Sequence, residues 1–175
     1  VLTLGETTAP YADPLIFLFL GGFLLALALQ RWGLDRRIAL LALALAGGHP
    51  RMVIAGIMAA TAFLSLWISN TATAIAMLPI GQSTLLAMER RAEGDANAGA
   101  AYARFAPALM LGIAFAATIG GMGSLIGTPP NALLAGYLRE AHGIDIGFAQ
   151  WFLIGLPAVF VLLPIAWFML VRVAF

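Results

Sequence analysis

Apolar residues extend along most of the chain in stretches that polar residues interrupt only briefly. The first stretch extends from Pro14 to about Gln30, and a shorter one, Ile38–Ala46, follows a group of arginines. Crossing a bilayer takes about 17–25 apolar residues, so the first predicts a membrane span and the second a helix in the interface. We expect four units: a scaffold span with an interfacial helix (14–51), a hairpin (52–88), a broken helix (105–138) and a last span (148–172). Between the hairpin and the broken helix, the charged residues 89–104 predict a loop.

The stretch over residues 52–88 is too long for one crossing. As a single helix its roughly 37 residues would extend ~55 Å, far more than the hydrocarbon thickness. Its middle is polar, because residues 69–73 read Ser-Asn-Thr-Ala-Thr. Each half has only about 17 residues, slightly short for a full crossing. Short halves joined by a polar tip predict a re-entrant helical hairpin.

The stretch over residues 105–138 is also interrupted, by glycines and a serine at 120–124 and by Gly-Thr-Pro-Pro-Asn at 127–131. Irregular backbone does not face lipid, because each unpaired N–H or C=O costs several kcal/mol there. Such breaks occur where the backbone lines a cavity or is buried in protein, and they indicate a transporter's binding site. We therefore expect an all-α polytopic membrane protein with a broken transmembrane helix.

Composition supports a membrane protein and argues against other classes. Hydrophobic residues make up 62% of the chain and charged residues 10%, with a mean hydropathy of +0.99, whereas about 25% of a soluble domain is charged. Basic residues form no cluster interleaved with aromatics, so no nucleic-acid partner is expected. The chain has no cysteine, which excludes disulfides and thiolate chemistry.

The nine basic residues are all arginine, and their positions test the topology. If residues 52–88 enter and leave on one face, Arg139 alone lies on the far side. The positive-inside rule then makes the arginine-rich side cytoplasmic. Sidedness does not separate a re-entrant hairpin from two full spans, but the short halves and polar tip favour re-entry. The arginines on the shared side are Arg31, Arg36, Arg37, Arg51, Arg90, Arg91, Arg104 and Arg172.

Both breaks carry residue types that begin helices. Ser69, Asn70 and Thr71 are N-cap types, and Thr128 precedes prolines, which the first helical positions tolerate. A helix N-terminus favours an anion through its free N–H groups and its dipole. Two such N-termini could therefore bind one carboxylate without a buried cationic side chain.

Oxygen atoms at the same breaks are hard ligands that would suit Na+. They are hydroxyl, amide and carbonyl oxygens of Ser65, Ser69, Asn70 and Gly127. A lone Ser-Asn-Thr often only makes hydrogen bonds between helices, and Gly-x-x-x-Gly spacing usually reflects packing. The interpretation as a site therefore depends on the two breaks occurring together.

Residues 65–73 followed by Leu78-Pro79 resemble the first Ser-Asn-Thr hairpin of the divalent anion/sodium symporter (DASS) family. Residues 119–121 and 126–131 resemble that family's unwound loop in the following helix. The motifs occur in the right order, and the resemblance covers nearly the whole chain. It implies one inverted repeat of an elevator-type transporter, homodimeric at full length, in the lipid of the bacterial inner (plasma) membrane.

The resemblance also implies residue roles. The first sodium site maps onto Ser65, Ser69, Asn70 and Gly127, and a substrate carboxylate would touch Asn70 and Thr71, with Thr128 and Pro129 nearby. Family substrates are C4 dicarboxylates, citrate or, in some branches, sulfate. The clean Ser-Asn-Thr motif favours the carboxylate branch. We therefore expect sodium-coupled symport of di- or tricarboxylates such as succinate, and no enzyme activity.

Other readings stay open. The chain lacks the family's second Ser-Asn-Thr repeat, so we expect a truncated sequence that does not transport alone. The arginine bias argues against two copies in opposite orientations. A sulfate transporter, an anion exchanger and an ion channel are alternatives, since broken helices also build selectivity filters. Ser124 is a weak candidate nucleophile, because no base lies within reach and His142 is expected in a loop.

Overall fold

The computed structural model describes residues 11, 14–92 and 96–174, and their regular structure is helical with no strand. This confirms the predicted all-α fold. The helices in chain order are α2 (Pro14–Arg31), α3 (Leu34–Ala46), α4 (Pro50–Ser65), α5 (Asn70–Ala92), α6 (Ala96–Met122), α7 (Pro129–His142) and α8 (Phe148–Ala174).

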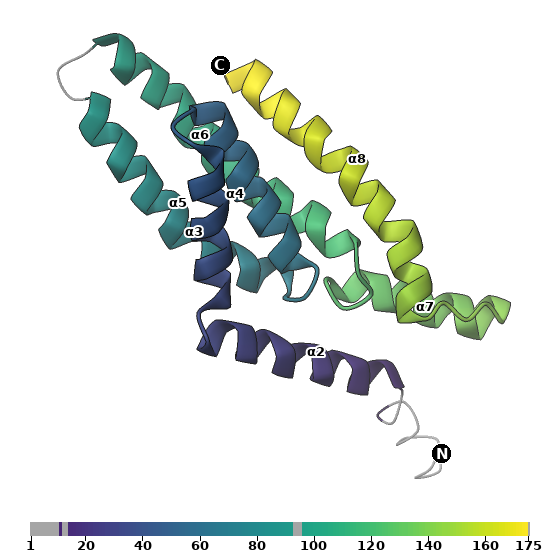
Figure 1. Ribbon diagram of the computed structural model, residues 1–175. Coiled ribbons are helices and arrows are strands. Elements are labelled where there is room, and N and C mark those ends of the chain that lie inside the picture. Colours follow the sequence, from purple (N-terminus) through teal and green to yellow (C-terminus); the bar gives the residue numbers. More distant parts are fainter. Residues whose placement is uncertain (1–10, 12–13, 93–95, 175) are drawn as a thin grey trace, which may run out of the picture.

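Helix α6 forms the centre of the bundle and packs against α4, α5 and α8 (Figure 1). Helices α4 and α5 form a hairpin whose turn, residues 66–69, is named the hairpin tip below. Residues 123–128, between α6 and α7, are named the break loop. Both lie in the lower part of Figure 1, at the end of the bundle opposite the C-terminus.

The first two helices bend sharply at a glycine. Gly33 has φ +60°, a left-handed conformation that glycine adopts without steric cost, and it precedes α3. The axes of α2 and α3 differ in direction by 64°. Helix α3 begins at Leu34, four residues before the short helix we expected, and packs on α4. Their backbones approach closely, since a Cβ on Gly56 would lie 2.9 Å from the Ala42 carbonyl oxygen.

The charged segment over residues 89–104 differs from our expectation of a loop. Helix α5 continues to Ala92 and α6 already begins at Ala96, so only residues 93–95 separate them, and these lie outside the described residues. The physical reason is helix propensity, because alanine, glutamate and arginine are among the strongest helix formers. The charged residues therefore lie where the chain leaves the apolar core, but they do not end α5 or α6.

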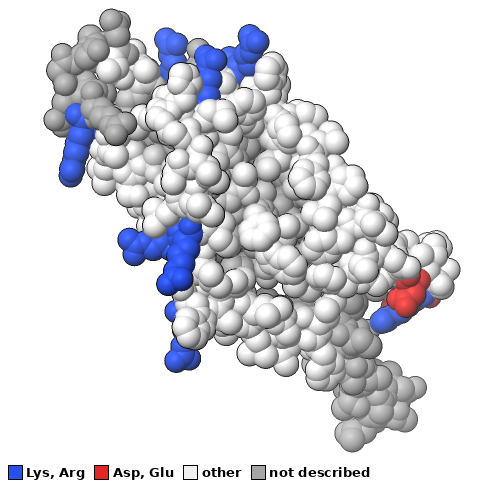
Figure 2. All heavy atoms as spheres, in the orientation of Figure 1, with Lys and Arg blue, Asp and Glu red and all other residues white. Residues whose placement is uncertain are grey.

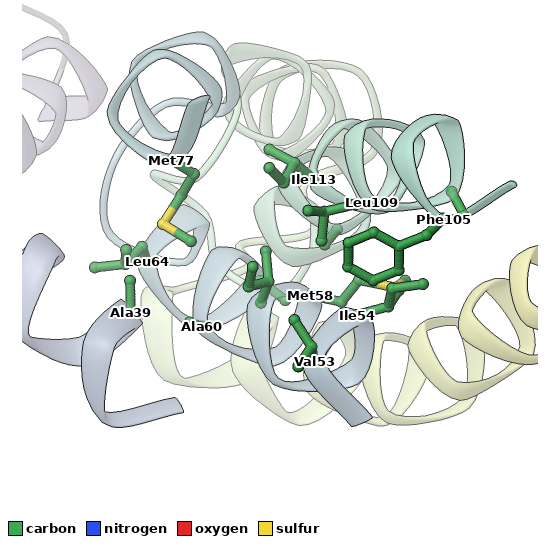
Figure 3. Packing of buried hydrophobic residues seen from close by; sticks show 14 residues of the cluster. Ala39, Val53, Ile54, Met58, Ala60, Leu64, Met77, Phe105, Leu109 and Ile113 are labelled. Carbon is green, nitrogen blue, oxygen red and sulfur yellow. The ribbon is translucent and has the colours of Figure 1, made fainter. Parts of the chain in front are cut away.

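The buried core lies between α3, α4, α5 and α6. Figure 3 shows Ile54 and Met58 of α4 meeting Phe105 and Leu109 of α6, all nearly inaccessible to solvent. Small residues bring these helices together, as at Gly112, where a Cβ would lie 3.1 Å from the Met58 side chain. In lipid such packing contributes van der Waals contact, since apolar side chains gain little by leaving hydrocarbon for protein.

Large apolar side chains cover the outside as well. Phe17 of α2 is 62% exposed, and Leu153 and Phe160 of α8 are 78% and 74% exposed. Among the described residues, three helices (α5, α6 and α8) are long and apolar enough to cross a membrane, and the bent pair α2–α3 makes a fourth candidate. A soluble protein rarely exposes contiguous apolar surface of this extent, so these faces are suited to lipid.

Charge is distributed unevenly over the surface. Figure 2 shows basic side chains along the left and upper edges of the molecule, and one basic group beside acidic ones at the lower right. That end is where Figure 1 places α7, the helix that carries Arg139 in its last turn. The side chain of Arg91, which we assigned to the arginine-rich side, lies outside the described residues.

Candidate functional site

The hairpin tip and the break loop contact each other directly. The Ser124 Oγ of the break loop donates a hydrogen bond to the Leu66 carbonyl of the hairpin tip. Gly127 lies against the end of α4, because a Cβ there would be 2.8 Å from the Ser65 carbonyl oxygen. The two interruptions of the helical pattern, more than fifty residues apart, thus form one junction inside the bundle.

Helix α5 begins at this junction with a side-chain cap. The Ser69 carbonyl accepts the Thr73 N–H at 2.9 Å, and its Oγ accepts the Ala72 N–H at 3.4 Å. Ser69 is therefore the N-cap residue, in agreement with the sequence prediction. The earlier N–H groups of α5 have no intrahelical partner, as at any helix N-terminus, and they give this point a positive potential.

Helix α7 begins differently. Thr128 occupies the N-cap position in an extended conformation (φ −147°, ψ 140°), but its side chain makes no capping hydrogen bond. Pro129 and Pro130, the first two helical residues, have no N–H to donate. The Asn131 N–H already bonds the Thr128 carbonyl at 3.1 Å. At this N-terminus the dipole and the Thr128 hydroxyl are therefore what α7 offers to an anion.

Several oxygen atoms surround the Asn70 side chain. One atom of its amide lies 3.0 Å from Ser65 Oγ, 3.1 Å from the Ala117 carbonyl oxygen and 3.3 Å from the Gly127 carbonyl oxygen. We name these atoms, together with the Asn70 amide, the oxygen cluster. Ser65 is fully buried, and its hydroxyl donates to the Ala117 carbonyl at 2.6 Å.

The Asn70 amide can face the oxygen cluster in two ways. With its nitrogen inward it donates to the oxygens of Ser65, Ala117 and Gly127. With its oxygen inward, Oδ1 accepts from Ser65 Oγ at 3.0 Å, and several oxygens converge without a hydrogen donor for each. A small hard cation stabilises such a group of oxygens, and oxygen ligands are what such cations prefer. The residues present therefore fit Na+.

The glycines of the motif make room for this arrangement. A Cβ on Gly121 would lie 1.9 Å from Asn70 Oδ1, and one on Gly120 would lie 2.3 Å from the Ala62 carbonyl oxygen. A Cβ on Gly127 would lie 2.5 Å from the Gly121 carbonyl oxygen. Side chains at these positions would separate α6 and the break loop from the hairpin.

The structure brings some of the expected site residues together and leaves others at the edge. Ser65, Asn70 and Gly127 form the oxygen cluster, whereas the Ser69 hydroxyl faces its own helix as a cap. The remaining three flank the cluster in sequence. Thr71 and Pro129 are exposed and Thr128 is half-buried, so all three are accessible to a ligand outside the oxygen cluster.

Sequence reasoning missed three contributors. The Ala117 carbonyl gave no signal, because a backbone oxygen within a helical pattern has no residue-type signature. Ser124 and Asn131 stood within the glycine-rich motifs without a structural role. Both are buried, and Asn131 Nδ2 donates to the carbonyls of Gly121 at 2.9 Å and Ser124 at 2.7 Å. A polar residue beside a break in an apolar helix was the available signal.

Helix α8 packs against the broken end of α6. Trp151 Nε1 donates to the Met122 carbonyl at 3.1 Å, one of the carbonyls left without a helical partner where α6 ends. A Cβ on Gly155 would lie 2.7 Å from the same carbonyl oxygen, so glycine permits this approach. Within the hairpin tip, Trp67 packs against Phe152 of α8 with ring centroids 5.9 Å apart.

Comparison with known proteins finds transporters over the whole chain. A family model described as citrate transporter (CitMHS) matches residues 1–175. The sodium-dependent dicarboxylate transporter SdcS is 42% identical over 175 residues in Staphylococcus aureus strains USA300 and NCTC 8325 / PS 47. The match covers 100% of this chain and 34% of each relative, so the chain spans about a third of their length.

The family and the fold agree on location and class. A transporter family with bacterial relatives, together with several apolar helices, places the chain in the plasma membrane as an integral protein. Because the family model matches every residue, the chain belongs to the citrate transporter (CitMHS) family, and the resemblance to divalent anion/sodium symporters is confirmed.

Proposed function

We propose that the protein containing this chain is a sodium-coupled symporter of di- or tricarboxylates such as succinate, and not an enzyme. The observation that carries the proposal is the junction of the hairpin tip and the break loop, where an oxygen cluster adjoins two helix N-termini. The family and the sodium-dependent dicarboxylate relatives support the same class of cargo.

Sodium would bind at Ser65, Ser69, Asn70 and Gly127. Ser65 and Gly127 already contribute oxygens to the oxygen cluster, Asn70 contributes its amide, and the Ala117 carbonyl adds a further oxygen. Ser69 is next to Asn70, and its carbonyl and hydroxyl are both accepting N–H groups of α5. Sodium there would compensate for the cluster's concentration of partial negative charge and would fix the Asn70 amide with its oxygen inward.

The substrate carboxylate would bind at Asn70, Thr71, Thr128 and Pro129, just outside the sodium site. Thr71 offers a hydroxyl and one of the unpartnered N–H groups of α5, and Thr128 offers a hydroxyl at the start of α7. No formally charged side chain occurs in the hairpin tip or the break loop. The anion would therefore depend on helix dipoles and on the nearby Na+, which explains why the two would bind together.

The transport cycle follows from this dependence. Sodium binds first and holds the hairpin tip and the break loop together, and the dicarboxylate then binds the completed site. Helices α4–α8 then move through the membrane as a unit, relative to a fixed scaffold that includes α2. The bend between α2 and α3 connects the scaffold to the moving unit. We propose a homodimer of the full-length protein, embedded in lipid, as the assembly that supplies the fixed scaffold.

Uptake of labelled succinate into proteoliposomes containing the full-length protein tests the proposal. We expect saturable uptake that a Na+ gradient drives, and Asn70→Ala should weaken both Na+ and succinate dependence, since the residue contributes to both sites. Ser83→Ala is the matched control, because its exposed hydroxyl in the same helix only bonds the Ile80 carbonyl.

Several outcomes would contradict the proposal. Wild-type activity in Asn70→Ala would mean that sodium and substrate do not bind at the proposed site. Saturable uptake of sulfate but not of succinate or citrate would show that the transported anion is inorganic. Uptake that requires anion preloaded inside the vesicles would show that the protein is an exchanger. Flux that does not saturate and ignores Na+ would indicate a channel.

A further inference from the structure

The Ser124 hydroxyl links the two halves of the junction. Ser124 is fully buried in the break loop, and its Oγ donates to the Leu66 carbonyl of the hairpin tip. The same oxygen accepts the Gly127 N–H at 3.0 Å. One hydroxyl thus donates to the hairpin tip and accepts from the break loop.

These bonds lead directly to the oxygen cluster. The Gly127 N–H is held by Ser124, and the carbonyl of the same residue faces Asn70 at 3.3 Å. Leu66, on the other side, immediately follows Ser65, whose hydroxyl belongs to the cluster. Ser124 therefore holds Gly127, whose carbonyl belongs to the oxygen cluster, and it also holds the hairpin tip, which directly follows Ser65.

The backbone of Ser124 is in turn held by a hydrogen bond from α7. Asn131, in the first turn of α7, donates one amide hydrogen to the Ser124 carbonyl at 2.7 Å and the other to the Gly121 carbonyl at 2.9 Å. Both carbonyls lie where α6 has ended and helical partners are missing. The break loop therefore has a defined shape, and Ser124 determines how that shape fits against the hairpin tip.

We propose that Ser124 is a positioning residue that sets the sodium affinity of the site by holding the hairpin tip and the break loop in register. This inference rests on the proposed sodium-coupled function. The Ser124 hydroxyl is not among the atoms of the oxygen cluster, since it bonds the Leu66 carbonyl and the Gly127 N–H instead. Without the hydroxyl the Leu66 carbonyl and the Gly127 N–H lose a buried partner, and the cluster oxygens lose their fixed separation.

The test compares Ser124→Ala with Ser124→Thr in the full-length protein. Half-saturating Na+ is measured by Na+-dependent thermal stabilisation of the purified protein, with K+ as the reference salt, and by succinate uptake. We expect Ser124→Ala to raise half-saturating Na+ about tenfold, as the loss of a buried hydrogen-bond bridge predicts. The succinate KM at saturating Na+ should stay within about twofold. Ser124→Thr, which retains the hydroxyl, should restore the sodium affinity.

A second buried hydroxyl provides the matched control. Thr61 is also fully buried, but its Oγ1 donates to the Ile57 carbonyl of its own helix at 2.7 Å and joins no second element. Thr61→Val should lower the melting temperature in K+ and leave half-saturating Na+ unchanged. If the extra methyl group of Ser124→Thr prevents folding, the contrast between Ser124→Ala and Thr61→Val still decides the question.

The inference is overturned if Ser124→Ala leaves half-saturating Na+ unchanged, or if Thr61→Val raises it equally. A different result would count against the proposed function itself. If the wild-type protein shows neither Na+-dependent stabilisation nor Na+-dependent uptake, the sodium site is wrong and the role of Ser124 is rejected with it.

Discussion

At the residue scale, the junction depends on glycines, which have no side chain, as much as on the polar side chains of Ser65 and Asn70. Gly120, Gly121 and Gly127 lie where a Cβ would collide with the hairpin backbone, with Asn70 or with the end of α6. The side chains of Ser65 and Asn70 can approach the carbonyl oxygen of Gly127 only because these glycines have no side chain in the way. The Gly-Gly and Gly-Thr-Pro motifs are therefore requirements of close approach, and glycine's conformational freedom is secondary here.

Gly121→Ala should abolish the sodium dependence of transport. Its Cβ would lie 1.9 Å from Asn70 Oδ1, so the amide must leave the oxygen cluster. Gly99→Ala is the matched control in the same helix, because nothing lies within 4 Å of a Cβ there and alanine favours a helix by about 0.5–1 kcal/mol over glycine. Succinate uptake and Na+-dependent thermal stabilisation provide the measurement. Wild-type sodium dependence in Gly121→Ala would contradict the geometry.

At the element scale, the broken end of α6 is stabilised by the two helices that follow it. The carbonyls at the end of α6 would be unpaired inside the membrane, which is costly. Asn131 of α7 satisfies two carbonyls at this end, and Trp151 of α8 satisfies that of Met122. Helix α8 therefore supports the broken helix and is also a candidate membrane span, and its tryptophan and glycine have positional roles.

Trp151→Phe should weaken sodium binding as well as stability. Removing the hydrogen bond to the Met122 carbonyl should cost about 0.5–1.5 kcal/mol and loosen the start of the break loop. Trp167→Phe removes a similar bond from α8, at 3.0 Å to the Arg51 carbonyl, far along the helix from the junction. Melting temperatures in K+ should fall comparably in both variants, and half-saturating Na+ should rise severalfold in Trp151→Phe alone. Equal sodium affinities in the two variants would assign Trp151 a purely structural role.

At the scale of the whole molecule, the hairpin and the arginines predict how the chain is oriented in the membrane. Helices α4 and α5 turn back at the hairpin tip, so the residues before α4 and after α5 lie toward one end of the bundle (Figure 1). Basic groups gather along the left and upper edges in Figure 2, whereas the end of α7 is opposite. This asymmetry is what the positive-inside rule requires of a chain with one orientation.

Single-cysteine labelling checks this topology, because the chain has no cysteine of its own. In a full-length background without other cysteines, Gly48→Cys and Ala87→Cys should react with a membrane-impermeant maleimide from the cytoplasmic face, and Ala141→Cys from the outer face. All three positions are exposed. Labelling of positions 48 and 87 from opposite faces would instead mean that residues 52–88 cross once.

The amino-acid sequence by itself determined the helical class, the positions of the breaks and the start of each helix after a break. These properties are local: apolar runs of membrane length, polar or Gly/Pro residues within them, and cap residues such as Ser69 and Thr128 act within a few positions. The same locality explains the errors at 89–104, where charge predicted a loop and helix propensity extended α5 and α6 instead.

Only the tertiary structure decided which groups meet at the junction. Ser65 contacts the Ala117 carbonyl 52 residues away, and Ser124 contacts the Leu66 carbonyl 58 residues away. Backbone carbonyls carry no residue-type signal, so their role depends on how α4, α6 and α8 pack. From the sequence we expected oxygen ligands at Ser65, Ser69, Asn70 and Gly127. The packing decided that Ser65, Asn70 and Gly127 face one another whereas Ser69 caps α5, and that Ser124, Asn131 and Trp151 hold the elements around them in place.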